Sequence, residues 1–374
     1  MFHTYKIERG IDMKTMSRSL RSSPKPRIFL LSVKRNLLPA LFCLFAACLV
    51  IFSKSNLSAA KTGLLLWANQ VVPSLLPFFM ATEMLSYTTI VSKIGKFLDP
   101  IMRPLFNVPG CGAYAFIMGI ISGYPVGAKI VSNFRLQGLC TKEEAERLVA
   151  FTNNSGPLFI LGTVGISFFG NTLVGILLLI THVLAGISVG ILFRFWKRKQ
   201  TNIKFSQTYS PIDTSKDMVS FSNLGEVLGK SILSAINSVM VIGGFVVLFS
   251  VVLSILDKSH LLQIGSSFLS PLLKAFGITD SRFSVSLLSG ILELTNGVKQ
   301  VALIPYKCIS VNIILAAFLL GFGGFSVLLQ VFSITAKTDI SIKAYFYGKV
   351  LHGLLAASYT FLMITYFPIF NLNL

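Results

Sequence analysis

The chain contains several apolar runs of membrane-spanning length, and these runs constrain its fold more than any other feature. The hydrocarbon core of a bilayer is about 30 Å thick, so a helix needs roughly 20 apolar residues to cross it. Hydrophobic residues make up 53% of the chain and charged residues 13%, which is more apolar surface than a soluble fold can bury. The sequence therefore predicts an all-α polytopic membrane protein. The clearest runs are 37–52, 62–85, 172–195, 232–256, 309–334 and 346–367.

Basic residues outnumber acidic ones by 33 to 14, and most of them lie outside the apolar runs. A nucleic-acid-binding protein would explain this charge but not the hydropathy, so we expect no nucleic acid as a partner. Segments rich in Lys and Arg tend to stay in the cytoplasm, where they can lie against anionic lipid. We predict a basic cytoplasmic segment at 1–36, a transmembrane anchor at 37–53 and a polar cytoplasmic linker at 197–225. Cleavage of the anchor as a signal peptide is the alternative, although the basic region is long for one.

The two halves on either side of this linker match each other weakly but in the same order. Matched residues lie about 170 positions apart, and this offset changes by only a few residues over the whole length. An internal duplication is therefore indicated, with a first Gate-like repeat at 62–196 and a second at 226–374. The matched pairs include Pro100 and Pro271, Gly119 and Gly290, Gly127 and Gly297, Lys129 and Lys299, and His182 and His352.

The distribution of basic residues favours one of two topologies. If residues 112–135 crossed the membrane fully, the cluster Lys197-Arg198-Lys199 would lie outside, against the positive-inside tendency. If that segment is instead a re-entrant hairpin, the cluster falls inside and the second repeat is inverted. We therefore predict two inverted repeats, each with about three spanning helices and a re-entrant helical hairpin, and about seven full spans with the anchor. Whether residues 112–135 re-enter or span stays open.

A polar, glycine-containing break interrupts the apolar sequence at matched positions in the two halves. Irregular backbone is tolerated at membrane depth only within protein or beside a watery cavity. A helix that restarts there presents unpaired N–H groups to an anion. Such paired breaks are typical of the central binding site of a transporter, whereas the alternative is a kink that only lets helices pack. The breaks are Ser122-Gly123-Tyr124-Pro125-Val126-Gly127-Ala128-Lys129 and Glu293-Leu294-Thr295-Asn296-Gly297-Val298-Lys299.

Charged and amide side chains near the breaks are the candidates for substrate binding. Lys129 and Lys299 could neutralise an acidic substrate, or snorkel at the hairpin ends. Glu293 could pair with Lys299, couple protons or bind a cation. The predicted substrate-binding residues are Ser122, Gly123, Tyr124, Gly127, Lys129, Asn153, Asn154, Ser155, Gly156, Glu293, Thr295, Asn296, Gly297 and Lys299.

The run at 153–156 offers two adjacent amides inside an apolar stretch, which suits recognition of a carboxylate, a ring nitrogen or a hydroxyl. Hydrogen bonding between helices is the alternative role for these amides. His182 and His352, each inside the last apolar run of its half, are expected to pack or to bond between helices rather than to carry protons.

The sequence shows none of the patterns that are typical of an enzyme or a metal site. The five cysteines form no CxxC motif and no Cys/His pairing. An HExxH motif and a paired nucleophile and base are also missing from the sequence. We therefore expect no catalytic residue, no metal ion and no cofactor.

Three strings resemble a known family: SGYPVGAKIV at 122–131, NNSGPLFILGTVG at 153–165 and ELTNG at 293–297. They are similar to those of the sporulation integral membrane protein family YlbJ, also called SpoVV, within the nucleoside-recognition or Gate domain group. The resemblance runs from about residue 37 to the end of the chain. It implies the fold of concentrative nucleoside transporters, with inverted repeats and re-entrant hairpins.

For this branch, the resemblance also implies transport of dipicolinic acid, a small aromatic dianion, across the outer forespore membrane. One alternative is a transporter of nucleosides or other small solutes, and another is a structural or regulatory sporulation protein without transport activity. Membrane lipid is an expected partner, whereas a coupling ion and a homo-oligomer stay open. Carrier and channel mechanisms are not distinguished by the sequence.

Overall fold

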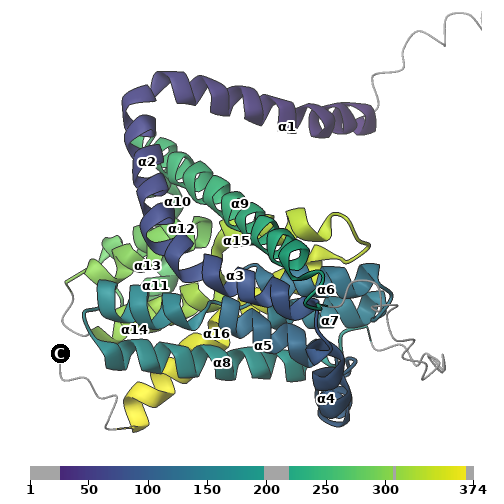
Figure 1. Cartoon of the computed structure of the whole chain (residues 1–374). Helices are drawn as coiled ribbons and strands as arrows, with labels where there is room; N and C mark the ends of the chain where they lie inside the picture. Colours follow the sequence, from purple (N-terminus) through teal and green to yellow (C-terminus); the bar gives the residue numbers. More distant parts are fainter. Residues whose placement is uncertain (1–25, 198–218, 306–308, 368–374) are drawn as a thin grey trace, which may run out of the picture. The chain divides into compact units, whose positions relative to one another are not determined.

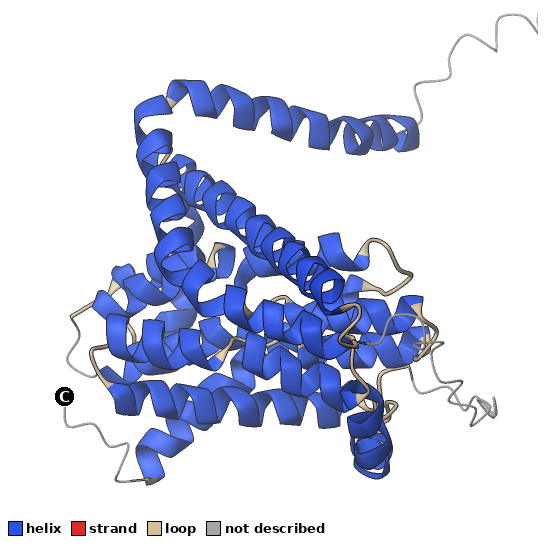
Figure 2. Cartoon of the chain, in the orientation of Figure 1, coloured by secondary structure: helices blue, strands red, loops and turns tan. Residues whose placement is uncertain are grey.

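The computed structural model describes residues 26–197, 219–305 and 309–367, and all regular structure in these ranges is helical (Figure 2). This confirms the predicted all-α class. Most of the predicted basic segment at 1–36 and of the linker at 197–225 lies outside the described residues. The chain up to Ser53 is a unit of its own. Its helix α1 (Pro26–Ile51) contains Pro39 and begins before the predicted anchor.

The rest of the chain is a second unit, in which two series of helices follow the same order (Figure 1). The first series is α2 (Ser53–Leu66), η1 (Trp67–Val71), α3 (Val72–Ser86), α4 (Ile90–Phe106), α5 (Gly112–Ser122), α6 (Val126–Leu136), α7 (Lys142–Thr152), η2 (Leu158–Phe168) and α8 (Thr172–Phe193). The second series is α9 (Leu224–Lys258), α10 (Leu261–Ser267), α11 (Ser270–Ala275), α12 (Ser281–Leu292), α13 (Leu294–Leu303), α14 (Ile309–Phe322), α15 (Gly324–Thr335) and α16 (Ile342–Tyr366).

These series correspond element by element. In the first series a long N-terminal stretch, α2 to α3, is followed by α4. In the second series the corresponding stretch is α9, and α10 and α11 follow it. A pair of short helices comes next, α5 and α6 or α12 and α13. An interrupted helix follows, α7 and η2 or α14 and α15, and one long helix, α8 or α16, ends each series. The inversion of the second series relative to the bilayer stays a prediction.

The two pairs of short helices are helical hairpins. Their helices have 11, 11, 12 and 10 residues, so each is about 15–18 Å long at 1.5 Å per residue. That length is about half of the 30 Å hydrocarbon core. Matched glycines bring the two helices of each pair together. A Cβ on Gly119 would lie 3.3 Å from the Cα of Gly127, and a Cβ on Gly297 would overlap the backbone of Gly290.

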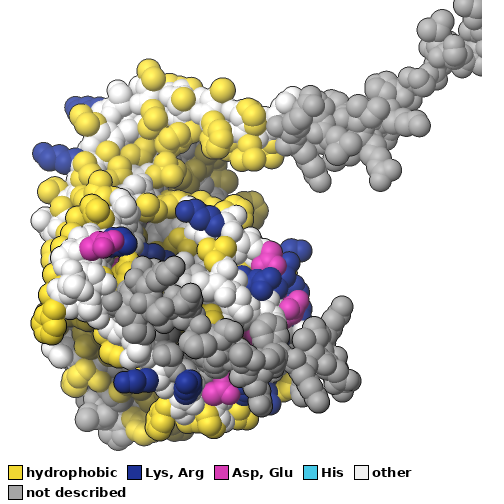
Figure 3. Space-filling view, turned by 45° about the vertical axis from the view of Figure 1, so that its right-hand side comes forward, with side chains coloured by type: hydrophobic (Ala, Val, Ile, Leu, Met, Phe, Trp, Pro, Cys, Tyr) yellow, Lys and Arg dark blue, Asp and Glu magenta, His cyan; other side chains and the backbone are white. Residues whose placement is uncertain are grey.

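Within the described residues, three helical stretches are long and apolar enough to cross a membrane: Thr172–Phe193, Leu224–Lys258 and Ser310–Thr335. This is fewer than the predicted seven or so, because breaks divide other apolar runs into shorter helices such as 75–86 and 158–168. Many large apolar side chains stay exposed, including Phe97, Phe268 and Phe276. Figure 3 shows how hydrophobic side chains cover much of one face. Such a surface is stable in lipid rather than in water, so the chain is an integral membrane protein.

The packing places the breaks close to one another. The two long helices α8 and α16 contact each other, and α14 packs along α16. Contacts also cross between the two series, since η2 packs against α13 and α15 packs against α6. Each interrupted helix therefore contacts the helical hairpin of the other series.

Candidate functional site

Three helix breaks meet around one small cleft of about 70 Å³. The breaks lie between α5 and α6, between α7 and η2, and between α12 and α13. The first part of α15, just after its own break at Gly323, completes the wall. The lining residues are Gly123, Tyr124, Ser155, Gly156, Glu293, Leu294, Thr295, Ser326, Val327 and Gln330, with Val71, Leu75, Phe159, Ile242 and Val246 as further apolar walls.

The break in the first hairpin depends on Gly123 and Tyr124. Gly123 has a φ of +79°, which L side chains rarely adopt. A Cβ at this position would also lie 2.9 Å from the backbone nitrogen of Gly156, so glycine lets the hairpin tip touch the neighbouring break. The Tyr124 hydroxyl donates to the carbonyl of Leu320 on α14 at 2.8 Å. The tip of the first hairpin is thus bonded to the second series.

Glu293 forms the break in the second hairpin and is buried. Its carboxylate accepts hydrogen bonds from the backbone N–H groups of Thr295 at 3.1 Å and Asn296 at 2.8 Å. A carboxylate at a helix N-terminus satisfies unpaired donors and favours the helix dipole. The chain's own side chain therefore occupies the N-terminus of α13 that was predicted to face an anion. Lys299, the partner considered for Glu293, is exposed on α13.

The break between α7 and η2 holds an unusual number of buried polar groups. The Asn153 Nδ2 donates to the Tyr345 hydroxyl at 3.0 Å, and the Asn154 Nδ2 donates to the carbonyl of Phe151 at 2.8 Å. Among the described residues, no hydrogen-bond partner is found for the Oδ1 of either asparagine or for the Oγ of Ser155. Buried acceptors are almost always paired, so these oxygens are candidates to accept hydrogen bonds from a substrate.

Lys129 does not line the cleft. It pairs with Glu83 of α3 and donates to the hydroxyls of Ser234 at 2.8 Å and Ser238 at 3.3 Å on α9. The ion pair therefore attaches the second helix of the first hairpin to α3 and α9. The attraction between opposite charges holds this lysine away from the break, a partner choice that the spacing in the sequence did not reveal.

The cleft gathers part of the predicted site. Ser122 bonds with the hydroxyl of Thr82 at 2.8 Å, and a Cβ on Gly127 would overlap the carbonyl of Thr152. The predicted residues that line the cleft are Gly123, Tyr124, Ser155, Gly156, Glu293 and Thr295. Those that lie beside or away from it are Ser122, Gly127, Lys129, Asn153, Asn154, Asn296, Gly297 and Lys299.

Lys349 on α16 lies next to this site and was missed in the sequence. Its side chain is 1% exposed. The Nζ donates to the backbone carbonyl of Asn153 at 3.0 Å, lies 3.2 Å from the Nδ1 of His352, and is 5.0 Å from the ring centroid of Tyr124. A lysine inside the apolar run at 346–367, three residues before a histidine, is the signal that could have identified it. Ser326 and Gln330 were missed as well.

The matched histidines His182 and His352 meet in the structure, with ring centroids 4.4 Å apart. The His352 Nε2 lies 3.0 Å from the carbonyl of His182, and the His182 Nε2 accepts the N–H of Ser155 at 3.1 Å. These two histidines therefore connect α16, α8 and the break at 153–156.

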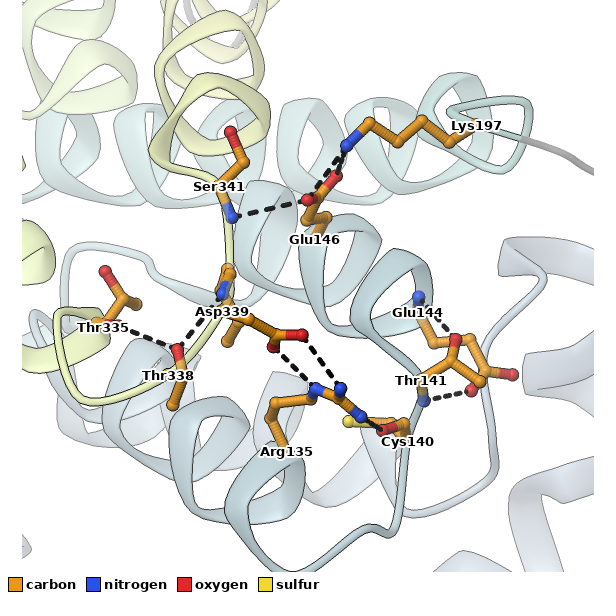
Figure 4. A network of polar contacts seen from close by, with 11 residues as sticks. Arg135, Cys140, Thr141, Glu144, Glu146, Lys197, Thr335, Thr338, Asp339 and Ser341 are labelled. Carbon is orange, nitrogen blue, oxygen red and sulfur yellow. Dashed lines mark hydrogen bonds and ion pairs between the residues drawn. The ribbon is translucent and has the colours of Figure 1, made fainter. Parts of the chain in front are cut away.

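A second polar network lies at the end of α6, the second helix of the first hairpin (Figure 4). Arg135, at the end of α6, forms two hydrogen bonds with Asp339, at 2.8 and 2.9 Å. Arg135 lowers the pKa of the Asp339 carboxyl below its usual range. The fully buried Glu146 accepts from the Nζ of Lys197 and from the backbone N–H of Ser341 at 3.3 Å. The network joins the first series to the connection between α15 and α16.

Comparison with known proteins gives two matches that agree with this geometry. The family Gate, described as nucleoside recognition, matches residues 68–180. That segment holds the first hairpin and the break at 153–156. The sporulation integral membrane protein YlbJ of Bacillus subtilis (strain 168) is 38% identical over 351 residues, which are 91% of this chain and 85% of the relative. No solved structure matches the chain. Since the identity extends over most of both proteins, the chain belongs to the family of the sporulation integral membrane protein YlbJ.

Proposed function

We propose that the protein is a membrane transporter of a small organic anion, and that its substrate is dipicolinate, moved across the outer forespore membrane during sporulation. The observation that carries the proposal is the cleft at which three helix breaks meet. Interrupted helices near the middle of a membrane protein expose backbone donors and acceptors, which transporters use to bind solutes. The name of the B. subtilis relative supports a sporulation role, and the description of the Gate family, nucleoside recognition, supports the binding of a small solute.

Transport would proceed by movement of the hairpins. The cleft volume of about 70 Å³ is well below the roughly 300–1,000 Å³ of ordinary ligand pockets, so a substrate can enter only if its walls separate. Because η2 contacts α13 and α15 contacts α6, moving one hairpin shifts the interrupted helix of the other series. Because the two repeats are predicted to be inverted, such coupled movement would open the cleft to one side of the membrane and then to the other. We propose no catalysed reaction.

The charges around the cleft bear on the substrate. Glu293 is the one charged side chain among the lining residues described, and two backbone N–H groups already bind its carboxylate. The Lys349 Nζ lies 5.0 Å from the ring centroid of Tyr124, and Tyr124 also lines the cleft. A substrate carboxylate beside Tyr124 would therefore feel the positive charge of a buried lysine, which acts strongly at low dielectric.

The second candidate is a transporter of neutral nucleosides. The observation that favours it is the composition of the cleft wall, whose lining residues include Glu293, Gln330 and the hydroxyl-bearing Ser155, Thr295 and Ser326. These groups suit the hydroxyls and ring nitrogens of a nucleoside. A neutral solute would need no positive charge.

Counterflow in liposomes tests both candidates. Purified full-length protein is reconstituted with unlabelled dipicolinate inside, and entry of labelled dipicolinate is followed with external nucleoside or a second aromatic dicarboxylate as competitor. Saturable entry that only the dicarboxylate blocks supports the anion transporter. Entry blocked by the nucleoside supports the second candidate. If folded protein exchanges neither solute, transport is refuted and a structural or regulatory role is favoured.

A further inference from the structure

Lys349 is a buried amine without an acidic partner among the described residues. Its three close contacts are a backbone carbonyl, a histidine nitrogen and a tyrosine ring. A buried charge is expensive unless it is paired, whereas a neutral amine is tolerated. Lysine can therefore bind or release a proton when its surroundings change. The described ion pairs use other lysines, for example Lys129 with Glu83.

The hydrogen bonds around the histidines define their tautomers. Because the His352 Nε2 faces the carbonyl of His182 at 3.0 Å, this nitrogen carries the hydrogen. The His352 Nδ1 is then an acceptor for the Lys349 Nζ at 3.2 Å. The His182 Nε2 accepts the N–H of Ser155 at 3.1 Å, which places the hydrogen of that ring on Nδ1. In these tautomers the neutral His352 ring can accept a hydrogen bond from a protonated Lys349.

The titratable groups that face Lys349 include no acid. They are His352 on α16, His182 on α8, and Tyr124 at the tip of the first hairpin. Tyr345, one turn before Lys349 on α16, accepts a hydrogen bond from Asn153. The helices α14 and α15, which contact α16, contain no titratable residue. On α7, Glu146 binds Ser341 and Lys197, and Arg147 donates to the carbonyl of Trp196. A positive charge on Lys349 is therefore stabilised by the Nδ1 of His352 and by two groups that adjoin the cleft, the carbonyl of Asn153 and the ring of Tyr124.

The Asn153 carbonyl and the Tyr124 ring both belong to segments of the chain that must move if the cleft opens. Tyr124 lines the cleft and is bonded to Leu320, and Asn153 begins the break whose Ser155 and Gly156 also line it. An anion beside Tyr124 would favour the protonated lysine. Separation of the hairpin from the break would remove its carbonyl and ring contacts. The affinity of Lys349 for a proton is thus linked to the conformation and to the bound anion.

We propose that Lys349 is the proton-binding site of this transporter and that one proton moves together with each organic anion. This inference rests on the proposed function and names its coupled ion. On the side where the anion enters, the Lys349 amine takes a proton from water and becomes an ammonium. On the other side the ammonium returns that proton to water as the anion leaves. His352 positions the amine and accepts its hydrogen bond in the occluded state.

Proton movement in liposomes tests the proposal. The full-length protein is reconstituted with a pH-sensitive dye inside and with the membrane potential clamped by potassium and valinomycin. Dipicolinate is then added outside. We expect the wild-type lumen to acidify, and an inward proton gradient to accelerate dipicolinate uptake. In Lys349→Arg, which keeps a charge that does not titrate, the acidification for each dipicolinate taken up should fall to the level of protein-free liposomes.

The matched control is Lys343→Met, since Lys343 lies exposed on the same helix, and it should acidify the lumen like the wild type. Wild-type counterflow without acidification would overturn the proton proposal but not the transport function. Acidification that survives in Lys349→Arg would overturn the assignment to this lysine. Wild-type protein that exchanges no dipicolinate would overturn the proposed function and this inference with it.

Discussion

Replacement of Glu293 tests whether its carboxylate caps α13 at the centre of the site. The carboxylate accepts the buried N–H of Thr295 and the partly buried N–H of Asn296. In Glu293→Ala both donors lose their partner. A buried unpaired donor costs about 1–3 kcal/mol, and a bond that water can replace is worth about 0.5–1 kcal/mol. We therefore expect a loss of about 2–3 kcal/mol in the free energy of unfolding.

Glu293→Ser is the matched variant, because serine is a good N-terminal cap without a charge. It should recover about half of that loss, since its hydroxyl can accept one of the two N–H groups. The free energy of unfolding is measured by titration of the purified protein with SDS. If the serine and alanine variants were equally destabilised, or if both matched the wild type, the capping role of Glu293 would be refuted.

Transport separates this structural role from a role in recognition. Glu293→Gln keeps the size of the side chain and removes its negative charge. For a dianionic substrate, loss of a like charge in the cleft should leave the apparent affinity for dipicolinate unchanged or improve it. A nucleoside would lose a hydrogen-bond acceptor and bind more weakly. Improved nucleoside counterflow with weakened dipicolinate counterflow would contradict the anion account.

Three further predictions concern other parts of the site. Gly127→Ala should cost about 1–3 kcal/mol and reduce counterflow, because the new methyl group would overlap the backbone of Thr152 and Asn153, where the break after α7 begins. Gly244→Ala, where the space is open, is the control, and equal effects on unfolding at both positions would refute the reasoning. Lys129→Met should destabilise the protein by about 1–2 kcal/mol, because it leaves Glu83 unpaired. Adding Glu83→Gln should restore most of this loss, and a double variant that shows no recovery in thermal unfolding would exclude the ion pair as the cause. The lowered pKa of Asp339 means that its ion pair with Arg135 stabilises the protein above roughly pH 4, and that this contribution is lost as the pH falls through the lowered pKa. Asp339→Asn should therefore cost at most about 1 kcal/mol at pH 7 and little near pH 3. An equal cost at both pH values in thermal unfolding would contradict this.

The parts of the fold that depend on local sequence could be predicted. Membrane-length apolar runs specify helices because lipid leaves backbone groups no other partner. The breaks at Gly123 and Glu293 were recognisable because glycine, proline and charged residues interrupt an apolar run at matched positions. The polar break at 153–156 was found for the same reason. Whether the second series is inverted in the membrane remains a prediction from the distribution of basic residues.

The choice of partners by charged side chains could not be predicted, since it depends on tertiary contacts. Lys129 follows a break but pairs with Glu83, which lies on a different helix. Lys349 is distant in sequence from every break and reaches Asn153 only because α16 packs against α7. Glu293 finds its donors within its own helix, so its capping role, unlike the pairing of Lys129, depends on local sequence alone.

The central claim is that the cleft at the three breaks binds the substrate, and blocking that cleft tests it most directly. Ser326 is buried in the cleft wall on α15, whereas Leu329 on the same helix is exposed. Binding of labelled dipicolinate to purified protein is compared for the wild type, Ser326→Phe and Leu329→Phe, with gel filtration to establish that each is folded. The account predicts that Ser326→Phe loses binding and Leu329→Phe keeps it. Wild-type affinity in folded Ser326→Phe would contradict the assignment of this cleft as the substrate site.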